Sequence, residues 1–205
     1  VPVLRARGVE VACVEVQLDP DEGRFSTVQS ANPEDPAAFE LGLDLARSSD
    51  ADLVIATDPD ADRLGALVKD AAGEFHFVDG NRLGVLMLDH VLRSQPPPPQ
   101  SMVLTTLVTS PLVRGVCAGR DVEVVDDLLV GFKHHAGYAE EARTMTNLFS
   151  VEESHGYVRG DAVRDKDGAM AALLLCECAA DMKQQGGTLH DRLREIWRAC
   201  GYHRE

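Results

Sequence analysis

Strand-like and helix-like segments alternate along this chain, and this alternation restricts the fold more than any other feature. The strand-like segments are short, rich in Val, Leu and Ile, and cover residues 53–56, 102–107, 122–125 and 148–151. The helix-like segments cover residues 36–49, 82–92, 111–117, 168–183 and 189–200. Such alternation is typical of α/β proteins with mainly parallel sheets. We therefore predict an α/β fold of two consecutive mixed α/β units, with sheets layered with helices.

The boundary between the two units is predicted near residue 78, so that they comprise residues 1–78 and 79–205. The predicted strands of the first unit are 9–16, 53–56 (a buried parallel strand), 64–68 and 75–78. The last two strands are expected to form a hairpin. Ligands of parallel α/β sheets bind at loops beyond the carboxyl ends of strands, and we expect a site there.

The balance of charges excludes some classes of function. The chain has 205 residues and a net charge of −14, which repels polyanions, so no nucleic-acid partner is expected. No apolar run is long enough to span a bilayer, so no membrane partner is expected. The five cysteines show no ligand spacing and no disulfide framework, which favours a reducing, cytoplasmic location. The N-terminus has neither an initiator Met nor a signal peptide, as expected of a chain that begins within a longer protein.

An acidic loop follows the strand-like residues 53–56. Asp58, Asp60 and Asp62 alternate along it, and in extended backbone such residues project to one side. Three converging carboxylates repel one another unless a hard cation lies between them. The adjacent Arg63 favours Mg²⁺ whose coordination is completed by a substrate phosphate or water.

Two alternatives exist for this loop. An EF-hand calcium loop begins with the same spacing but needs Gly at its sixth position and Glu at its twelfth. Here these positions are Arg63 and Lys69, which excludes an EF-hand. A solvated acidic turn without a metal stays open.

Two further loops carry candidate sugar ligands. Glu152 and Ser154 follow a strand and project the same way, so they offer a carboxylate and a hydroxyl to vicinal sugar hydroxyls. A helix-capping turn is an equally good interpretation. His155 is the only histidine whose position beside such a loop favours a functional role. Lys133 lies in the predicted loop 130–133, where a solvated lysine is the alternative.

Lys166 precedes the predicted helix 168–183. It is a candidate for phosphate contact or proton transfer. The alternative is a charged approach to the helix, with Asp167 as the N-terminal cap.

In order, residues 57–64, 131–133, 152–157 and 165–168 resemble motifs of the α-D-phosphohexomutase superfamily. The resemblance covers essentially the whole chain. It implies domains two (incomplete at its N-terminus) and three of a four-domain fold, at 1–78 and 79–205. Residues 32–34 and 201–203 resemble, more narrowly, the branch of this superfamily with phosphopentomutase-like and glucose-1,6-bisphosphate-forming members.

The resemblance implies a Mg²⁺-dependent isomerase that transfers phosphate to and from a sugar phosphate through a sugar bisphosphate. Asp58, Asp60 and Asp62 would hold Mg²⁺. Catalytic roles fall to Arg63, which would steady phosphate, and to Lys166. The implied substrate-binding residues are Lys133, Glu152, Ser154 and His155.

Two parts of the family pattern have no match here: the phosphoserine loop of the first domain and the phosphate-binding loop of the fourth. Both are expected elsewhere in the same polypeptide. Ser110 lies beside a third-domain strand and lacks the following His-Asn, so it is rejected as the nucleophile. His134 replaces an aromatic residue found in many relatives, which leaves the preferred sugar open. A non-catalytic module that binds metal and sugar phosphate is the alternative function. A HAD-type phosphatase is disfavoured because the acidic triplet follows a helix instead of the first strand.

Overall fold

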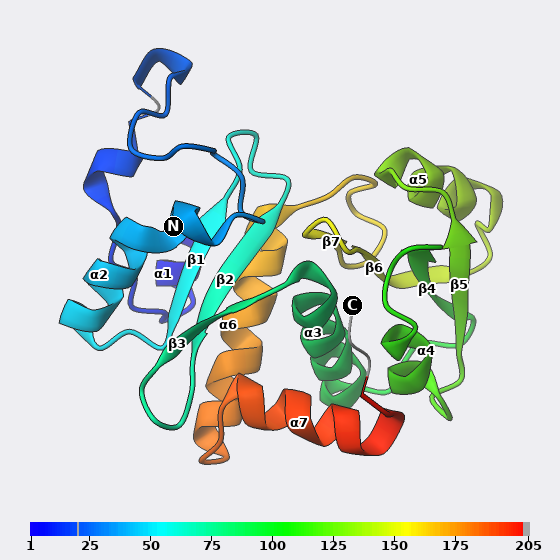
Figure 1. Cartoon of the computed structure of the whole chain (residues 1–205). Helices are drawn as coiled ribbons and strands as arrows, with labels where there is room; N and C mark the ends of the chain where they lie inside the picture. Colours follow the sequence, from blue (N-terminus) through cyan, green and yellow to red (C-terminus); the bar gives the residue numbers. More distant parts are fainter. Residues whose placement is uncertain (20, 203–205) are drawn as a thin grey trace.

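The computed structural model describes residues 1–19 and 21–202, which form two β-sheets with helices between and around them (Figure 1). The helices are α1 (Pro2–Ala6), α2 (Glu40–Ser49), α3 (Gly80–Ser94), α4 (Leu112–Cys117), α5 (Phe132–Glu141), α6 (Gly168–Gln184) and α7 (Leu189–Cys200). The strands are β1 (Leu53–Thr57), β2 (Leu64–Lys69), β3 (Phe75–Val78), β4 (Ser101–Thr106), β5 (Val122–Leu128), β6 (Thr146–Glu152) and β7 (Gly156–Val158). Short 3₁₀ turns occupy Glu15–Gln17, Asp21–Gly23 and Pro36–Phe39.

The first sheet has the order β1-β2-β3 and is entirely antiparallel. The predicted hairpin is confirmed as β2 and β3, but the prediction of a buried parallel strand at residues 53–56 is wrong. Leu53 pairs with Val68 in an antiparallel register, β1 lies at the sheet edge, and Val54 is its only buried residue. The reason is the length of the connection. Residues 58–63 can close a turn, whereas a parallel neighbour needs a crossover of a dozen residues or more.

The second sheet has the order β5-β4-β6-β7. Strands β4, β5 and β6 are parallel, as predicted, and β4 is buried along its whole length. The three-residue strand β7 pairs antiparallel with β6 and was not predicted, because three residues are too few to show a period. The loops that follow Glu152 and Leu128 lie at the carboxyl ends of these strands, where α/β sheets bind ligands.

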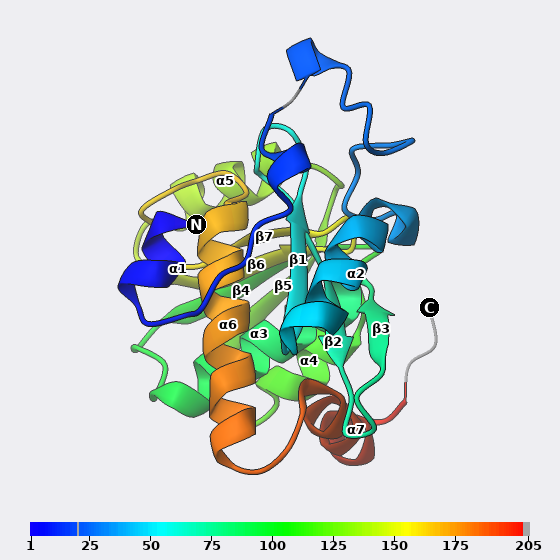
Figure 2. The ribbon, with the colours of Figure 1, turned by 90° about the vertical axis from the view of Figure 1, so that its left-hand side faces the viewer.

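Helices α3 and α6 lie between the two sheets (Figures 1 and 2). Because side chains alternate along a strand, Leu64, Ala66 and Val68 of β2 join the core that α3, α6 and α7 form. Leu67 points to the opposite face and packs with Phe39 of the segment before α2. Strand β2 therefore contributes to two hydrophobic clusters, and the larger one contains residues from both halves of the chain.

Two predicted segments differ in the structure. Residues 9–16 form coil and a 3₁₀ turn and pair with no described strand. Apolar alternation gives a strand only where a sheet edge accepts its hydrogen bonds. The predicted loop 130–133 runs directly into α5, whose sequence hides the helix because His134, His135 and Gly137 have low helix propensity. Packing of the buried Phe132 and His135 overrides this local preference.

None of the helices within the described ranges combines the length and apolarity needed to cross a bilayer. The five cysteines, all within the described ranges, are free thiols.

Candidate functional site

The acidic loop forms the turn between β1 and β2. One carboxylate oxygen from each of Asp58, Asp60 and Asp62 lies within 4.8 Å of the other two. Asp58 is buried, and its Oδ1 accepts hydrogen bonds from the backbone amides of Asp62 (3.1 Å) and Arg63 (3.0 Å). Ala61 at the tip adopts a left-handed conformation with φ of 57°, which turns the chain back on itself. The backbone thus brings the three predicted ligands together.

The charges in this loop suit a hard cation. Burial tends to raise the pKa of Asp58, but hydrogen bonds from Arg63 hold it below its ordinary value. Burial, reinforced by Asp58, raises the pKa of Asp62 despite its pairing with Lys166. Carboxylate oxygens are the ligands that Mg²⁺ prefers, and this donor set therefore fits the ion.

Arg63 lies beside the carboxylates and is held from two sides. Its Nε lies 2.7 Å from Asp58 Oδ2, and its Nη1 lies 2.9 Å from Glu34 Oε1. Glu34 belongs to the segment before α2, 29 residues earlier in the chain. No pattern within the acidic loop indicated this partner.

Lys166 reaches the same loop from the segment before α6. Its Nζ lies 2.8 Å from Asp62 Oδ2 and 5.8 Å from the centroid of the Phe132 ring. The amide of Gly168 donates to the carbonyl of Ala61 at 3.1 Å, and a Cβ at Gly168 would lie 2.6 Å from that oxygen. The glycine therefore allows α6 to begin directly against the acidic loop. Asp167 caps α6 as predicted, accepting from the amide of Met170.

The loop between β6 and β7 lies next to these groups, since Arg63 bridges to Gly156 in an antiparallel pairing. Glu152 is buried, its Oε1 accepts from the Gly131 amide at 2.6 Å, and burial raises its pKa. Ser154 is half-buried beside it.

His155 and Lys133, two other predicted sugar ligands, differ sharply in exposure. His155 is buried between the sheets with φ of 64°, and its Nδ1 lies 3.0 Å from the Leu64 carbonyl oxygen. Lys133 is exposed in the first turn of α5. Ser110, rejected as a nucleophile, is buried, and its Oγ accepts from the Leu112 amide at 3.2 Å.

Glu153 was missed by the sequence reasoning and braces the sugar-loop candidates. Its Oε2 accepts from the hydroxyls of Thr106 and Thr109, each at 3.1 Å. Its carbonyl oxygen would lie 2.0 Å from a Cβ at Gly80, so the loop packs on the start of α3. The repeated Glu at 152 and 153 was the only available signal, and alternation alone assigns these two side chains to opposite faces.

His135 was also missed, although it is buried beside Glu152. Its ring stacks on Phe132 with 4.5 Å between centroids, and its Nε2 lies 3.7 Å from Glu152 Oε1. Neither ring nitrogen has a hydrogen-bond partner among the described residues. Burial lowers the pKa of His135 to about 4, so the ring is neutral at pH 7.

Replacing His135 with leucine is expected to reduce the loss of stability in acid. In the native chain the unfolded state takes up this proton below pH 6.5, whereas the folded state does so only near pH 4. Stability is therefore lost as pH falls through this window, by up to about 3 kcal/mol. Urea unfolding of both proteins between pH 7 and pH 4 measures the difference. Parallel curves of unfolding free energy against pH for His135→Leu and the native chain would contradict the prediction.

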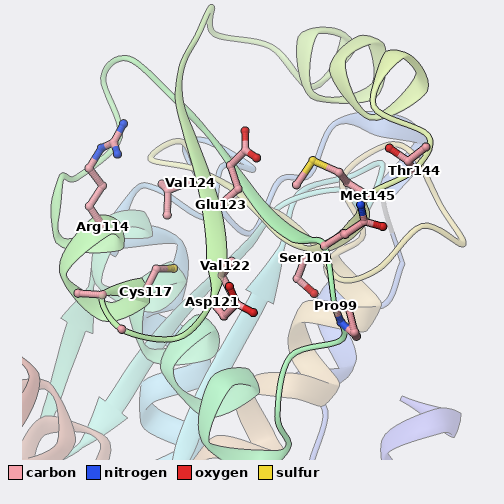
Figure 3. A pocket seen from close by; sticks show the side chains of 13 residues that line it. Pro99, Ser101, Arg114, Cys117, Asp121, Val122, Glu123, Val124, Thr144 and Met145 are labelled. Atoms are coloured by element: carbon pink, nitrogen blue, oxygen red, sulfur yellow. The ribbon is translucent and has the colours of Figure 1, made fainter.

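A cavity of about 890 Å³ lies at the other end of the second sheet (Figure 3). Ser101 and Val122, the first residues of β4 and β5, line it together with Cys117 and Arg114 of α4. It is remote from the carboxyl ends of the strands and shares no residue with the acidic loop or the β6–β7 loop. The candidate site is the loop cluster, and this cavity is separate from it.

Comparisons with known proteins agree on one family. The profile for "Phosphoglucomutase/phosphomannomutase, alpha/beta/alpha domain II" matches residues 1–73, and that for domain III matches residues 79–200. A phosphoglucomutase of Staphylococcus haemolyticus is 37% identical over 98% of this chain, which spans 36% of that protein. A Staphylococcus aureus phosphoglucomutase is 38% identical over 94% of this chain, which spans 35% of that protein.

Solved structures show the same fold. A putative phosphomannomutase from Thermus thermophilus superposes with a TM-score of 0.67 at 21% identity, over 86% of this chain and 37% of the other. The phosphoglucomutase parafusin of Paramecium superposes with a TM-score of 0.60 at 22% identity, over 87% of this chain and 31% of the other. With both profiles matched in order along its length, this chain belongs to the phosphoglucomutase/phosphomannomutase family.

Proposed function

We propose that this chain is the cation-binding and sugar-binding part of a Mg²⁺-dependent phosphohexose mutase of the phosphoglucomutase or phosphomannomutase type. The whole protein would isomerise hexose or pentose phosphates through a bisphosphorylated sugar. The phosphoserine and a further phosphate-binding loop would lie in other domains of the same polypeptide. One observation carries the proposal: three carboxylates converge within 4.8 Å beside Arg63 and Lys166.

In this proposal the acidic loop positions the cation and Arg63 positions the phosphate. Mg²⁺ bound there would neutralise charge on the transferring phosphoryl group. Asp58 is oriented by two backbone amides, so its carboxylate needs no rearrangement to serve as a ligand. The guanidinium of Arg63 and the ammonium of Lys166 supply charge-assisted hydrogen bonds to phosphate oxygens. Lys166 is also a candidate for proton transfer.

The sugar would lie against the loop between β6 and β7. Glu152, with Oε1 held by the Gly131 amide, has a second oxygen to accept from a sugar hydroxyl. Ser154, His155 and Lys133 are proposed as the other sugar contacts. The bracing by Glu153 keeps this loop in place while either end of the sugar phosphate is presented to the phosphoserine.

We also propose that the two domains divide near residue 78. The domain II profile ends at residue 73 and the domain III profile begins at residue 79, which supports this division. The core around β2 contains residues from both sides of this division.

The proposal is tested by assaying two purified proteins, this 205-residue chain and the product of its complete reading frame. We expect Mg²⁺-dependent conversion of glucose 1-phosphate by the complete protein, primed by glucose 1,6-bisphosphate and stopped by a chelator. The 205-residue chain should show no turnover under the same conditions.

Either of two outcomes would overturn the proposal. Turnover by the 205-residue chain would mean that Ser110 or another residue here replaces the missing phosphoserine. An inactive complete protein, tested with glucose, mannose and pentose phosphates, would support a non-catalytic binding module instead.

A further inference from the structure

The segment Asn32–Pro33–Glu34 lies against the start of β2, and its sequence resembled a family branch without indicating this contact. The carbonyl oxygen of Pro33 approaches Gly65 so closely that a Cβ there would lie 2.2 Å away. Asn32 Oδ1 accepts from the Glu34 amide at 3.1 Å, which closes the segment into a tight turn. The glycine in β2 and this turn together set the position of Glu34.

Glu34 is thereby placed beside Arg63. Arg63 directly precedes β2 and lies two residues before Gly65. Arg63 Nη1 lies 2.9 Å from Glu34 Oε1 and 3.4 Å from Asn32 Oδ1. The Nε of the same guanidinium lies 2.7 Å from Asp58 Oδ2. Because a guanidinium is planar and rigid, fixing two of its nitrogens fixes the direction of the third. Among the described residues, Nη2 makes no hydrogen bond, so it is the donor left for a ligand.

We infer that Glu34 is a positioning residue for Arg63, and that it aims Nη2 at the phosphoryl group. The inference rests on the proposed function for the identity of that ligand. The side chain of Glu34 makes its ion pair with Arg63 and none with the three aspartates of the acidic loop. Without Glu34, the guanidinium keeps its hydrogen bond from Nε to Asp58 and can rotate about it. Another carboxylate is then within reach, because Asp62 Oδ1 lies 3.9 Å from Nε. An arginine paired with Asp62 would compete with the cation for that carboxylate.

The sign of the effect separates positioning from plain electrostatics. Glu34 is an acidic residue near an anion site, so loss of its charge alone should strengthen phosphate binding. Loss of positioning should instead lower kcat for phosphoryl transfer. Glu34→Gln keeps the acceptor oxygen at the same place, whereas Glu34→Ala removes it. Positioning therefore predicts that Gln rescues most of what Ala loses, while electrostatics predicts that both changes act alike.

The first arm of the experiment uses the 205-residue chain and does not depend on enzyme activity. The Nη1–H groups of Arg63, which Glu34 accepts from, are observed by ¹⁵N NMR, with their signals assigned by Arg63→Lys. We expect protected, ordered Nη1–H groups in the native chain and in Glu34→Gln. In Glu34→Ala their hydrogen exchange should be about tenfold faster. In Glu40→Ala, which changes an exposed glutamate of α2, it should be unchanged.

The second arm uses the complete protein and steady-state kinetics. Glu34→Ala should lower kcat about five- to twentyfold with less than about twofold change in KM, because Arg63 acts on the transferring phosphoryl group. Glu34→Gln should stay within about threefold of the native kcat. An inactive complete protein would defeat the proposed function, but the NMR arm would still decide the role of Glu34. Unchanged hydrogen exchange at Arg63 in Glu34→Ala would overturn the inference. Equal increases in kcat/KM in Glu34→Ala and Glu34→Gln would overturn it as well.

Discussion

Asp60→Asn is expected to weaken the binding of Mg²⁺ to this chain about tenfold or more, which corresponds to about 1.4 kcal/mol. The change removes one of three converging carboxylate charges and keeps the shape of the side chain. Asp60 is the clearest of the three ligands to test because it is exposed and makes no hydrogen bond with described residues. Asp58, in contrast, also holds the turn through two amides, so its replacement would disturb the backbone as well.

Isothermal titration calorimetry with MgCl₂ at low ionic strength measures this effect directly. Asp44→Asn, an exposed change on α2 that removes the same charge, is the matched control and should alter the affinity less than about twofold, because exposed distant charges are screened. Equal affinities for the native chain and Asp60→Asn would mean that the loop is only a solvated acidic turn. The proposed metal site would then be lost, although the family assignment would stand.

Asp89→Asn is expected to cost about 3 kcal/mol of folding stability. Asp89 of α3 is 4% exposed, and both of its oxygens are held by arginines. Arg192 of α7 donates from Nη2 to Oδ1 (2.7 Å) and from Nε to Oδ2 (2.8 Å), and Arg93 Nε donates to Oδ2 (2.9 Å). Loss of the charge of Asp89 leaves the two arginines only their more exposed partners, Asp181 for Arg93 and Glu195 for Arg192. Both arginines keep some contact with solvent, which places the cost at the low end for a buried pair.

The pH dependence of this change gives a second check. Burial tends to raise the pKa of Asp89, but hydrogen bonds from Arg192 and Arg93 lower it below its ordinary value of 3.8. A carboxyl group with a lowered folded pKa stabilises the fold above its unfolded pKa and loses that contribution as pH falls below it. The difference between the native chain and Asp89→Asn in urea unfolding should therefore shrink below pH 3.8. Asp181→Asn, which removes the more exposed partner of Arg93, should cost less than about 1 kcal/mol. A cost this small for Asp89→Asn would show that α3 and α7 are held by apolar packing alone.

The helices and the parallel strands of the second unit were predictable because each carries a local signal, helical spacing in the helices and a short apolar run in the strands. The segments that became α3, α6 and α7 show apolar residues at helical spacing, and they also contain the caps that start them, such as Asp167 before α6. Local signals of this kind failed for α5, whose helix depends on burying Phe132 and His135 against the second sheet. They failed also for β1, where the antiparallel register was set by a short turn and not by the apolar run itself.

The site shows the same division. The three aspartates could be picked out as candidate metal ligands because they lie within a few residues of one another, so that a single turn suffices to bring them together. Glu34 and Lys166 join Arg63 and Asp62 from segments far away in the chain, and no spacing within the sequence predicts such meetings. Lys166 was a candidate from its place before the predicted helix 168–183, but its contact with Asp62 came from the structure.

By itself the sequence determined the α/β class, most helices, the convergence of three carboxylates in the acidic loop and, through ordered motifs, the family. These features depend on residues close together in the chain, where side-chain period, turn chemistry and charge repulsion act locally. Only the tertiary structure decided that β2 shares its core with α6 and α7, that Glu34 holds Arg63, and that His135 lies buried beside Glu152. Such contacts arise from packing between distant segments, which depends on the shape of the whole core and leaves no period in the sequence.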